Sequence, residues 1–179
     1  MFNVYGTRVS IQEGDLLHMP ADGLVIAAND HLWMGGGPGL RVKQAGGEAI
    51  EVDAVRQGPV NLGAAVATPG GETAFRKIFH AVVMGQDLKV RHEHIGEALG
   101  TGLRLASREG IETLLIAPLE SEELTGPFHD AAHAVATTLF EKLGDLRLKN
   151  VVLAVSRVEA REAYRAAILK SIAEQSGGR

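Results

Sequence analysis

Residues 24–39 read LVIAANDHLWMGGGPG, and most of the fold prediction rests on them. Gly23–Ala28 is an almost continuous apolar run of strand length, which is typical of a strand buried on both faces. Asn29 ends this run, and a short loop then leads to three consecutive glycines, Gly35–Gly37. Pro38 is a residue type favoured in the first turn of a helix. The stretch therefore predicts a buried strand, a glycine-rich loop and a helix, in that order.

The three glycines predict a site for an anion. Without a Cβ, the backbone of Gly35–Gly37 can adopt positive φ and approach a ligand closely. The helix that follows offers free N–H donors and the positive end of its dipole, which favour a phosphate. Two common phosphate motifs are absent, because Leu40 stands where a dinucleotide fingerprint needs glycine and no Gly-Lys pair precedes a serine or threonine. The alternative is that the glycines serve only a tight turn.

Composition excludes several classes of protein. The chain has 179 residues, no cysteine and a net charge of −4. Disulfides and thiolate metal sites are therefore impossible, and a nucleic-acid partner is not expected, because binding nucleic acid favours a basic surface. No apolar run approaches the ~20 residues of a membrane span, and the N-terminus lacks a signal-peptide pattern. We expect a cytoplasmic protein without membrane contact.

The rest of the chain alternates strands and helices. Strands are predicted over residues 8–13, 23–28, 61–68, 77–83, 113–118 and 150–156. Helices are predicted over residues 38–55, 92–109 and 127–143, and a last helix opens at a capping-box pattern, 156–159. This alternation predicts a single α/β domain over residues 1–175, with a mixed, largely parallel sheet of six or seven strands covered by helices on both faces. Residues 176–179 are expected to form a disordered tail.

Ligands of such sheets bind where loops leave the carboxyl ends of the strands. Three loops then become the candidate walls of a site. They follow the strands that end near Asn29, Pro118 and Ser156, and they span residues 29–37, residues 119–126 and the region of Ser156. We expect the main pocket between the first two of these loops, with Asp15 at one end.

The sequence resembles the macro domain family of ADP-ribose-binding modules and ADP-ribosyl hydrolases. The resemblance is carried by GDLL at residues 14–17, by PADGLVIAAN at residues 20–29 and by the three glycines. It continues in KIFHAV at residues 77–82 and in the strand and loop of residues 113–126. The order and spacing hold from about residue 6 to about residue 172, so the resemblance implies a three-layer α/β/α macro fold for nearly the whole chain.

The resemblance also implies roles for individual residues. Asp15, followed by Leu16, matches the acidic residue that accepts from the adenine amino group, and Asn29 matches the asparagine that contacts the distal ribose. Gly35–Gly37 match the loop beside that ribose and the diphosphate. The second phosphate loop, which wraps the diphosphate from the other side, is matched by Ser121, Glu122, Glu123, Leu124, Thr125 and Gly126. Carboxylate and amide groups can make these hydrogen bonds.

Four departures from the family pattern concern the ligand. Ile26 replaces the first amide of the family's asparagine-alanine-alanine-asparagine run. Pro38 replaces a residue that is usually valine and removes a backbone N–H. Glu122 and Glu123 stand where the second phosphate loop usually has a small residue and glycine. Ser156 or its neighbour stands where an aromatic residue would stack on adenine. These departures predict binding weaker than is usual in the family, or none detectable.

Three functions remain open. The first is binding of ADP-ribose or a related nucleotide diphosphate. The second is hydrolysis of an ADP-ribose derivative, with Asn29 and a bound water in the catalytic role. Gly39 stands where one hydrolase subgroup carries an acidic residue. The third is a degenerate macro fold with another ligand or a protein partner. No cofactor, metal or oligomeric state is predicted, and His129 and His133 are expected to be a surface pair.

Each singled-out residue also has a structural interpretation. Asp15 could be a turn former or an N-cap, and Asn29 could close its strand through an Asx turn. His80 is expected to be a hydrogen-bonded core histidine, because it lies inside an apolar strand. Trp33 and Met34 either form an apolar wall for a ligand or pack on the domain.

Overall fold

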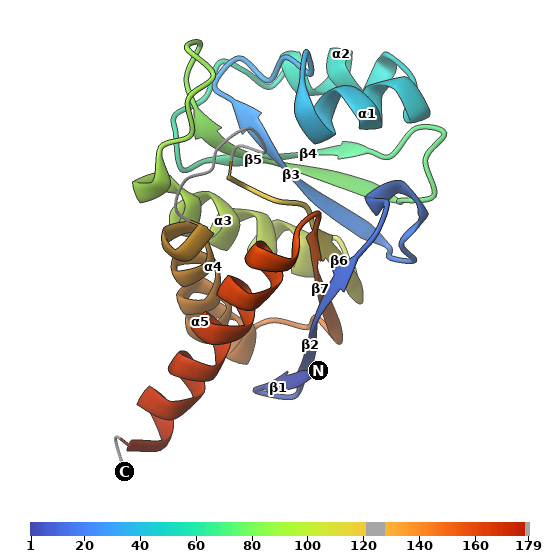
Figure 1. The fold of residues 1–179 in the computed structure, drawn as a ribbon. Coiled ribbons are helices and arrows are strands. Elements are labelled where there is room, and N and C mark those ends of the chain that lie inside the picture. The colour runs from blue at the N-terminus through green and yellow to red at the C-terminus, as the bar shows by residue number, and fades with distance from the viewer. Residues whose placement is uncertain (121–127, 178–179) are drawn as a thin grey trace.

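A seven-stranded sheet forms the middle layer of the computed structural model, which describes residues 1–120 and 128–177 (Figure 1). The strands lie in the order β1-β2-β7-β6-β3-β5-β4. Their bounds are β1 Phe2–Val4, β2 Thr7–Glu13, β3 Gly23–Asn29, β4 Ala65–Pro69, β5 Lys77–Met84, β6 Thr113–Ile116 and β7 Asn150–Val155. The five inner strands are mutually parallel, and only the edge strands β1 and β4 pair antiparallel. The predicted mixed, largely parallel sheet is confirmed.

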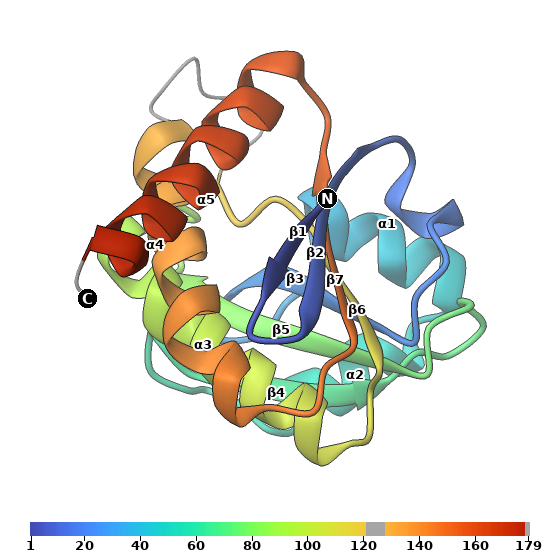
Figure 2. The ribbon, with the colours of Figure 1, turned by 90° about the horizontal axis from the view of Figure 1, so that it is seen from below.

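Helices cover both faces of this sheet, as predicted. The α-helices are α1 Gly37–Gly46, α2 Ala49–Val55, α3 Ile95–Arg108, α4 Phe128–Lys142 and α5 Val158–Gly177. Three short 3₁₀ turns are η1 Leu16–His18, η2 His92–His94 and η3 Leu143–Asp145. Figures 1 and 2 show α1 and α2 on one face, and α3, α4 and α5 on the other. No helix within the described ranges is both long and apolar enough to cross a membrane.

The alternation of side chains along β3 explains why both faces need a cover. Leu24 and Ile26 point into the core beneath α1, whereas Val25 points into the larger core beneath α3, α4 and α5. All three side chains are buried. Because both faces of the strand are apolar, neither can be left to water, and burying an aliphatic side chain contributes about 2 kcal/mol. This explains the almost unbroken apolar run.

The helix predicted over residues 38–55 is wrong in one respect, because it is two helices. α1 ends at Gly46, and Gly47 has φ of +100°, a conformation that favours glycine. The Gly47 N–H donates to the Lys43 carbonyl, which closes α1. A Cβ at Gly46 would lie 2.5 Å from the Ile50 side chain, so the tight packing between the two helices also needs glycine.

Other differences lie at element ends. β1 was not predicted, because three residues carry no periodicity and this edge strand exists only by pairing with β2. β4 begins at Ala65 rather than Asn61, and β6 ends at Ile116 rather than Pro118. Ser176 and Gly177, which were expected in the tail, belong to α5. Residues 178 and 179 lie outside the described ranges.

Candidate functional site

The carboxyl ends of the five parallel strands share one edge of the sheet. Asp15 lies just beyond β2, the glycine loop follows β3, and Ser156 follows β7 as an exposed residue. A contact between Asp15 and Arg41 of α1 joins the end of β2 to the helix that the glycine loop opens. The second predicted phosphate loop, residues 121–126, lies outside the described residues.

The backbone of the glycine loop is open to solvent. Gly35, Gly36 and Gly37 are all exposed, and a Cβ built on any of them meets no atom of the described residues within 4 Å. Only Gly37 has positive φ, at +55°, so only this position requires glycine for conformational reasons. Gly36 is the N-cap of α1, and its extended backbone is accessible to any residue. The open space beside Gly35 and Gly36 is available to a ligand.

Asn29 holds the glycine loop in place. Its side-chain oxygen accepts from the backbone N–H groups of His31 and Trp33, each at 3.2 Å, and its side-chain nitrogen donates to the Trp33 carbonyl at 2.8 Å. A register irregularity between Ala28 and Asn29 shifts the pairing of β3 with β5 just before this residue. The Asx-turn interpretation of Asn29 is thus what the geometry shows.

A glutamate that sequence reasoning missed fixes the other end of this loop. Glu51 of α2 accepts from the Met34 N–H at 2.6 Å and pairs with Lys43 of α1 at 3.1 Å. The side chains of Glu51 and Lys43 are 18% and 21% exposed, so the pair is largely shielded from water. No local pattern indicates this contact, because a helix break separates Lys43 from Glu51.

Asp15 is an N-cap, and it is also a charged end of the candidate site. Its carboxylate accepts from the Leu17 N–H at 3.1 Å and from a ring nitrogen of His18 at 3.1 Å, and it pairs with Arg41. The Leu17 N–H and the Arg41 guanidinium hold the pKa of Asp15 below its usual value. The side chain is still 40% exposed, so it has acceptor capacity for a ligand.

Glu120 lies at the start of the second loop. Burial raises the pKa of its carboxyl group, and the Tyr164 hydroxyl donates to this group at 3.1 Å, which opposes that effect. Tyr164 is a buried residue of α5. The hydrogen bond therefore ties the end of the segment after β6 to the helix that follows β7. Sequence reasoning did not single out Glu120.

The structure also places four further residues that the sequence analysis singled out. Met34 is buried in the core beneath α1, whereas Trp33 is 53% exposed. His80 is fully buried and its Nε2 lies 2.9 Å from the Thr68 hydroxyl, which confirms a core histidine. Ile26 lies in the core beneath α1, 3.9 Å from the Cβ position of Gly39.

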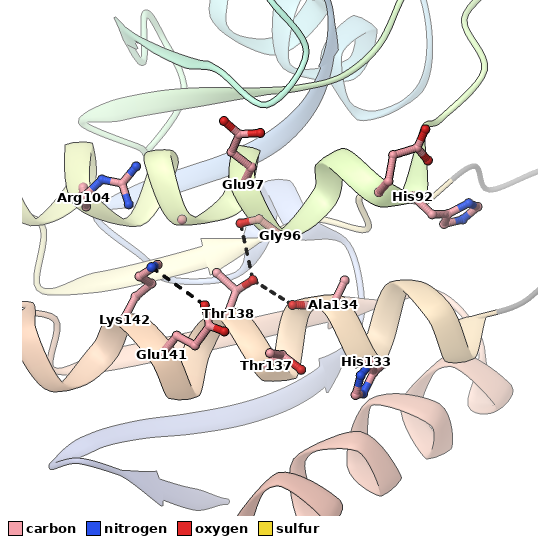
Figure 3. Close-up of a pocket in the computed structure, with 12 residues that line it drawn as sticks. His92, Gly96, Glu97, Arg104, His133, Ala134, Thr137, Thr138, Glu141 and Lys142 are labelled. Carbon is pink, nitrogen blue, oxygen red and sulfur yellow. Dashed lines mark hydrogen bonds and ion pairs between the residues drawn. The ribbon is translucent and has the colours of Figure 1, made fainter.

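A cavity of about 450 Å³ lies elsewhere, between α3 and α4 (Figure 3). Two glycines of α3, Gly96 and Gly100, leave room beside Thr138 of α4. None of the residues predicted to bind ligand lines this cavity. The pocket expected between residues 29–37 and 119–126 remains a prediction, because most of its second loop lies outside the described residues.

Comparison with known proteins shows which family has this fold and this sheet edge. The Macro domain family model matches residues 25–135, more than half of the 179-residue chain. An uncharacterized protein of Pyrobaculum aerophilum is 31% identical over 168 residues, which cover 91% of this chain and 90% of that protein. An uncharacterized protein of Aeropyrum pernix is 39% identical over 111 residues, 61% of this chain and 59% of that protein. The chain thus spans a little over half the length of the Aeropyrum protein.

Solved structures show the same fold. A mutant macrodomain of Oceanobacillus iheyensis, solved with ADPR, superposes with a TM-score of 0.82 at 19% sequence identity, covering 97% of each chain. A mixed sheet between two helical layers, with a glycine-opened helix at its carboxyl edge, defines an α/β/α protein of the macro type. The chain belongs to the macro domain family.

Proposed function

We propose that this chain binds ADP-ribose or a related nucleotide diphosphate at the carboxyl edge of its sheet. The observation that carries the proposal is the open backbone of Gly35 and Gly36 at the start of α1. A helix start with exposed N–H groups favours a phosphate. The Oceanobacillus macrodomain of the same fold was solved with ADPR, which supports this ligand class.

The geometry supports binding over hydrolysis. Hydrolysis would need Asn29 to hold a reacting water, yet its amide already makes three hydrogen bonds to the loop backbone. Asp15 is another polar candidate among the described residues, and its lowered pKa makes it a poor proton acceptor near neutral pH. We therefore assign the site to recognition. In an assay on ADP-ribosylated protein, adding this chain should not raise the rate of ADP-ribose release above the rate without it.

The direct test is a calorimetric titration with ADP-ribose, using Gly36→Val as the diagnostic variant. The extended backbone of Gly36 accepts valine, and a Cβ added there meets no atom of the described residues within 4 Å. The free energy of unfolding of Gly36→Val should differ from that of the parent by no more than about 0.5 kcal/mol. If the diphosphate lies beside Gly36, the added side chain will occupy its space, and affinity should fall at least about tenfold, or 1.4 kcal/mol.

Gly177→Val is the matched control, because a Cβ added at Gly177 also meets no atom of the described residues within 4 Å and Gly177 lies at the far end of α5. It should bind ADP-ribose as the parent does. Trp33 provides a second readout, since it is the chain's single tryptophan and is exposed beside the glycine loop. Its emission should change on titration. Equal affinities for the parent and Gly36→Val, or no binding by the parent, would contradict the proposal.

A further inference from the structure

Arg41 lies at the same end of the candidate site as Asp15. It belongs to α1, and its guanidinium donates to the Asp15 carboxylate from a position 26 residues along the chain. The side chain of Arg41 is 46% exposed and that of Asp15 is 40% exposed. The ion pair is therefore partly exposed to solvent, and it borders the edge where the ligand is proposed to bind.

The pairing with Asp15 does not use the flat faces of the Arg41 guanidinium. A guanidinium donates its N–H groups in its own plane, so a carboxylate partner is contacted at the edge of the group. The two faces stay clear of that bond, and a guanidinium is weakly hydrated and stacks readily on aromatic rings. Asp15 is itself held in place by the Leu17 N–H and by His18, so its carboxylate fixes the position of the Arg41 guanidinium.

The base end of the site needs such a surface. In the family pattern an aromatic residue near the end of the last strand stacks on the base, and this chain has Ser156 there, an exposed residue without a ring. A nucleotide base bound without a stacking partner would keep one apolar face in water. Arg41 is a planar group held beside the very carboxylate that is expected to contact the base edge.

We propose that the Arg41 guanidinium is the platform on which the base of the nucleotide stacks, in place of an aromatic ring. This inference rests on the proposed function and assigns its base subsite. Because every base has a π face, a stacked arginine tolerates different bases, whereas the Asp15 carboxylate accepts only from a base that offers an N–H donor at its edge. The ligand class is thus a nucleoside diphosphate sugar whose base is held mainly by its face.

The test compares Arg41→Lys with the parent, using ADP-ribose and its unsubstituted purine analogue, in which hydrogen replaces the 6-amino group of the adenine. Lysine keeps the positive charge but lacks the planar face. Affinity for ADP-ribose should fall about tenfold, the size of a stacking contact. Arg56→Lys is the control, since Arg56 forms an exposed ion pair with Asp53 on α2. It should leave both affinities unchanged, and thermal melting should show all three proteins folded.

The unsubstituted purine analogue separates stacking from an indirect role through Asp15, because its base has no N–H donor at the edge that Asp15 would contact. If Arg41 stacks, Arg41→Lys should weaken both ligands by the same factor. If Arg41 only orients Asp15 toward the adenine amino group, the loss should vanish for the analogue, which has no such group, and the inference is overturned. Unchanged ADP-ribose binding by Arg41→Lys also overturns it, while leaving the proposed function intact. If the parent binds neither ligand, both the proposed function and the role of Arg41 are overturned.

Discussion

Asn29 illustrates how one side chain can serve a loop before it serves a ligand. A single amide satisfies two backbone N–H groups and one carbonyl of the segment from His31 to Trp33. Its burial, with 6% of its surface exposed, makes these bonds worth more than exposed ones. The catalytic role expected of Asn29 stays a prediction. Its positioning of Trp33 and of the glycines that follow is what the geometry establishes.

His80 makes the stability of the fold depend on pH. Its ring is buried, and burial lowers its pKa to about 4, from an ordinary value of 6.5. In the unfolded chain, His80 therefore binds a proton below about pH 6.5, whereas in the folded chain it binds one only below about pH 4. Stability from this group is complete above pH 6.5 and is lost as the pH falls toward 4. The loss should reach about 3 kcal/mol.

Denaturant unfolding between pH 7 and 4 measures this effect, with His80→Leu as the comparison. Glu120 titrates in the opposite sense, because its pKa is raised, so the informative quantity is the difference between parent and variant. His80→Leu also loses the contact with Thr68, and it should be less stable than the parent at pH 7. Its stability should nevertheless fall less on acidification. Parallel pH profiles would show that His80 is not the source.

Glu122 and Glu123 are predicted to weaken the binding of a diphosphate. A carboxylate about 5 Å from a phosphate charge, at an effective dielectric near 20, costs roughly 3 kcal/mol, about a hundredfold in affinity. The double variant Glu122→Ala, Glu123→Gly should therefore bind ADP-ribose more tightly than the parent in calorimetry. Tight binding of equal strength by both proteins would show that these carboxylates point away from the ligand.

At the scale of elements, the break between α1 and α2 shapes the site. The turn at Gly47 brings α2 back beside α1, and this places Glu51 where it accepts from the Met34 N–H. A continuous helix would carry Glu51 away from the loop. The pair of Lys43 and Glu51 then braces the helices against each other and against the residue that precedes the three glycines.

Glu51→Ala should destabilise the protein by about 2 kcal/mol, because it leaves the largely shielded Lys43 without its partner and the Met34 N–H without an acceptor. ADP-ribose affinity should fall as well, since the glycine loop loses an anchor. Denaturant unfolding and calorimetry measure the two effects. Glu48→Ala is the control, because Glu48 is exposed and makes no side-chain cap bond at the start of α2. Equal stabilities of the two variants would refute the brace.

At the scale of the whole molecule, the site spans elements that are far apart in the sequence. The end of β2, the loop after β3 and the start of α1 all lie at one edge because the parallel strands are aligned. Ligand binding there should stabilise the sheet and both helical layers together. The larger core joins α3, α4 and α5 to the sheet through side chains that are nearly all buried, so local unfolding of one layer is unfavourable.

ADP-ribose should therefore raise the melting temperature of the whole domain in a single transition. At a concentration of 100 times Kd, linkage gives about 2.7 kcal/mol, which corresponds to roughly 5–10 °C for a chain of this size. Differential scanning calorimetry measures the shift, and Gly36→Val at the same ligand concentration should show a smaller one. A shift of equal size in Gly36→Val would place the ligand elsewhere.

The sequence alone determined the elements that depend on local pattern. The apolar run of β3 predicted a strand buried on both faces, and the sequence of residues 92–109 predicted the helix that α3 forms. The order of these elements predicted the layered sheet. Strand and helix periodicities are properties of neighbouring residues, and the family resemblance added the order of the ligand loops.

Only the tertiary structure decided which side chains meet. Arg41 contacts Asp15 because β2 and β3 are aligned in the same sheet, which brings the end of β2 near α1. Glu51 contacts Met34 because α2 turns back beside α1. β1 likewise exists only by pairing with β2. A hydrogen bond between residues 26 positions apart leaves no period in the sequence, because its geometry is set by the packing of entire elements. The fold was therefore predictable from pattern, and the contacts of the site were not.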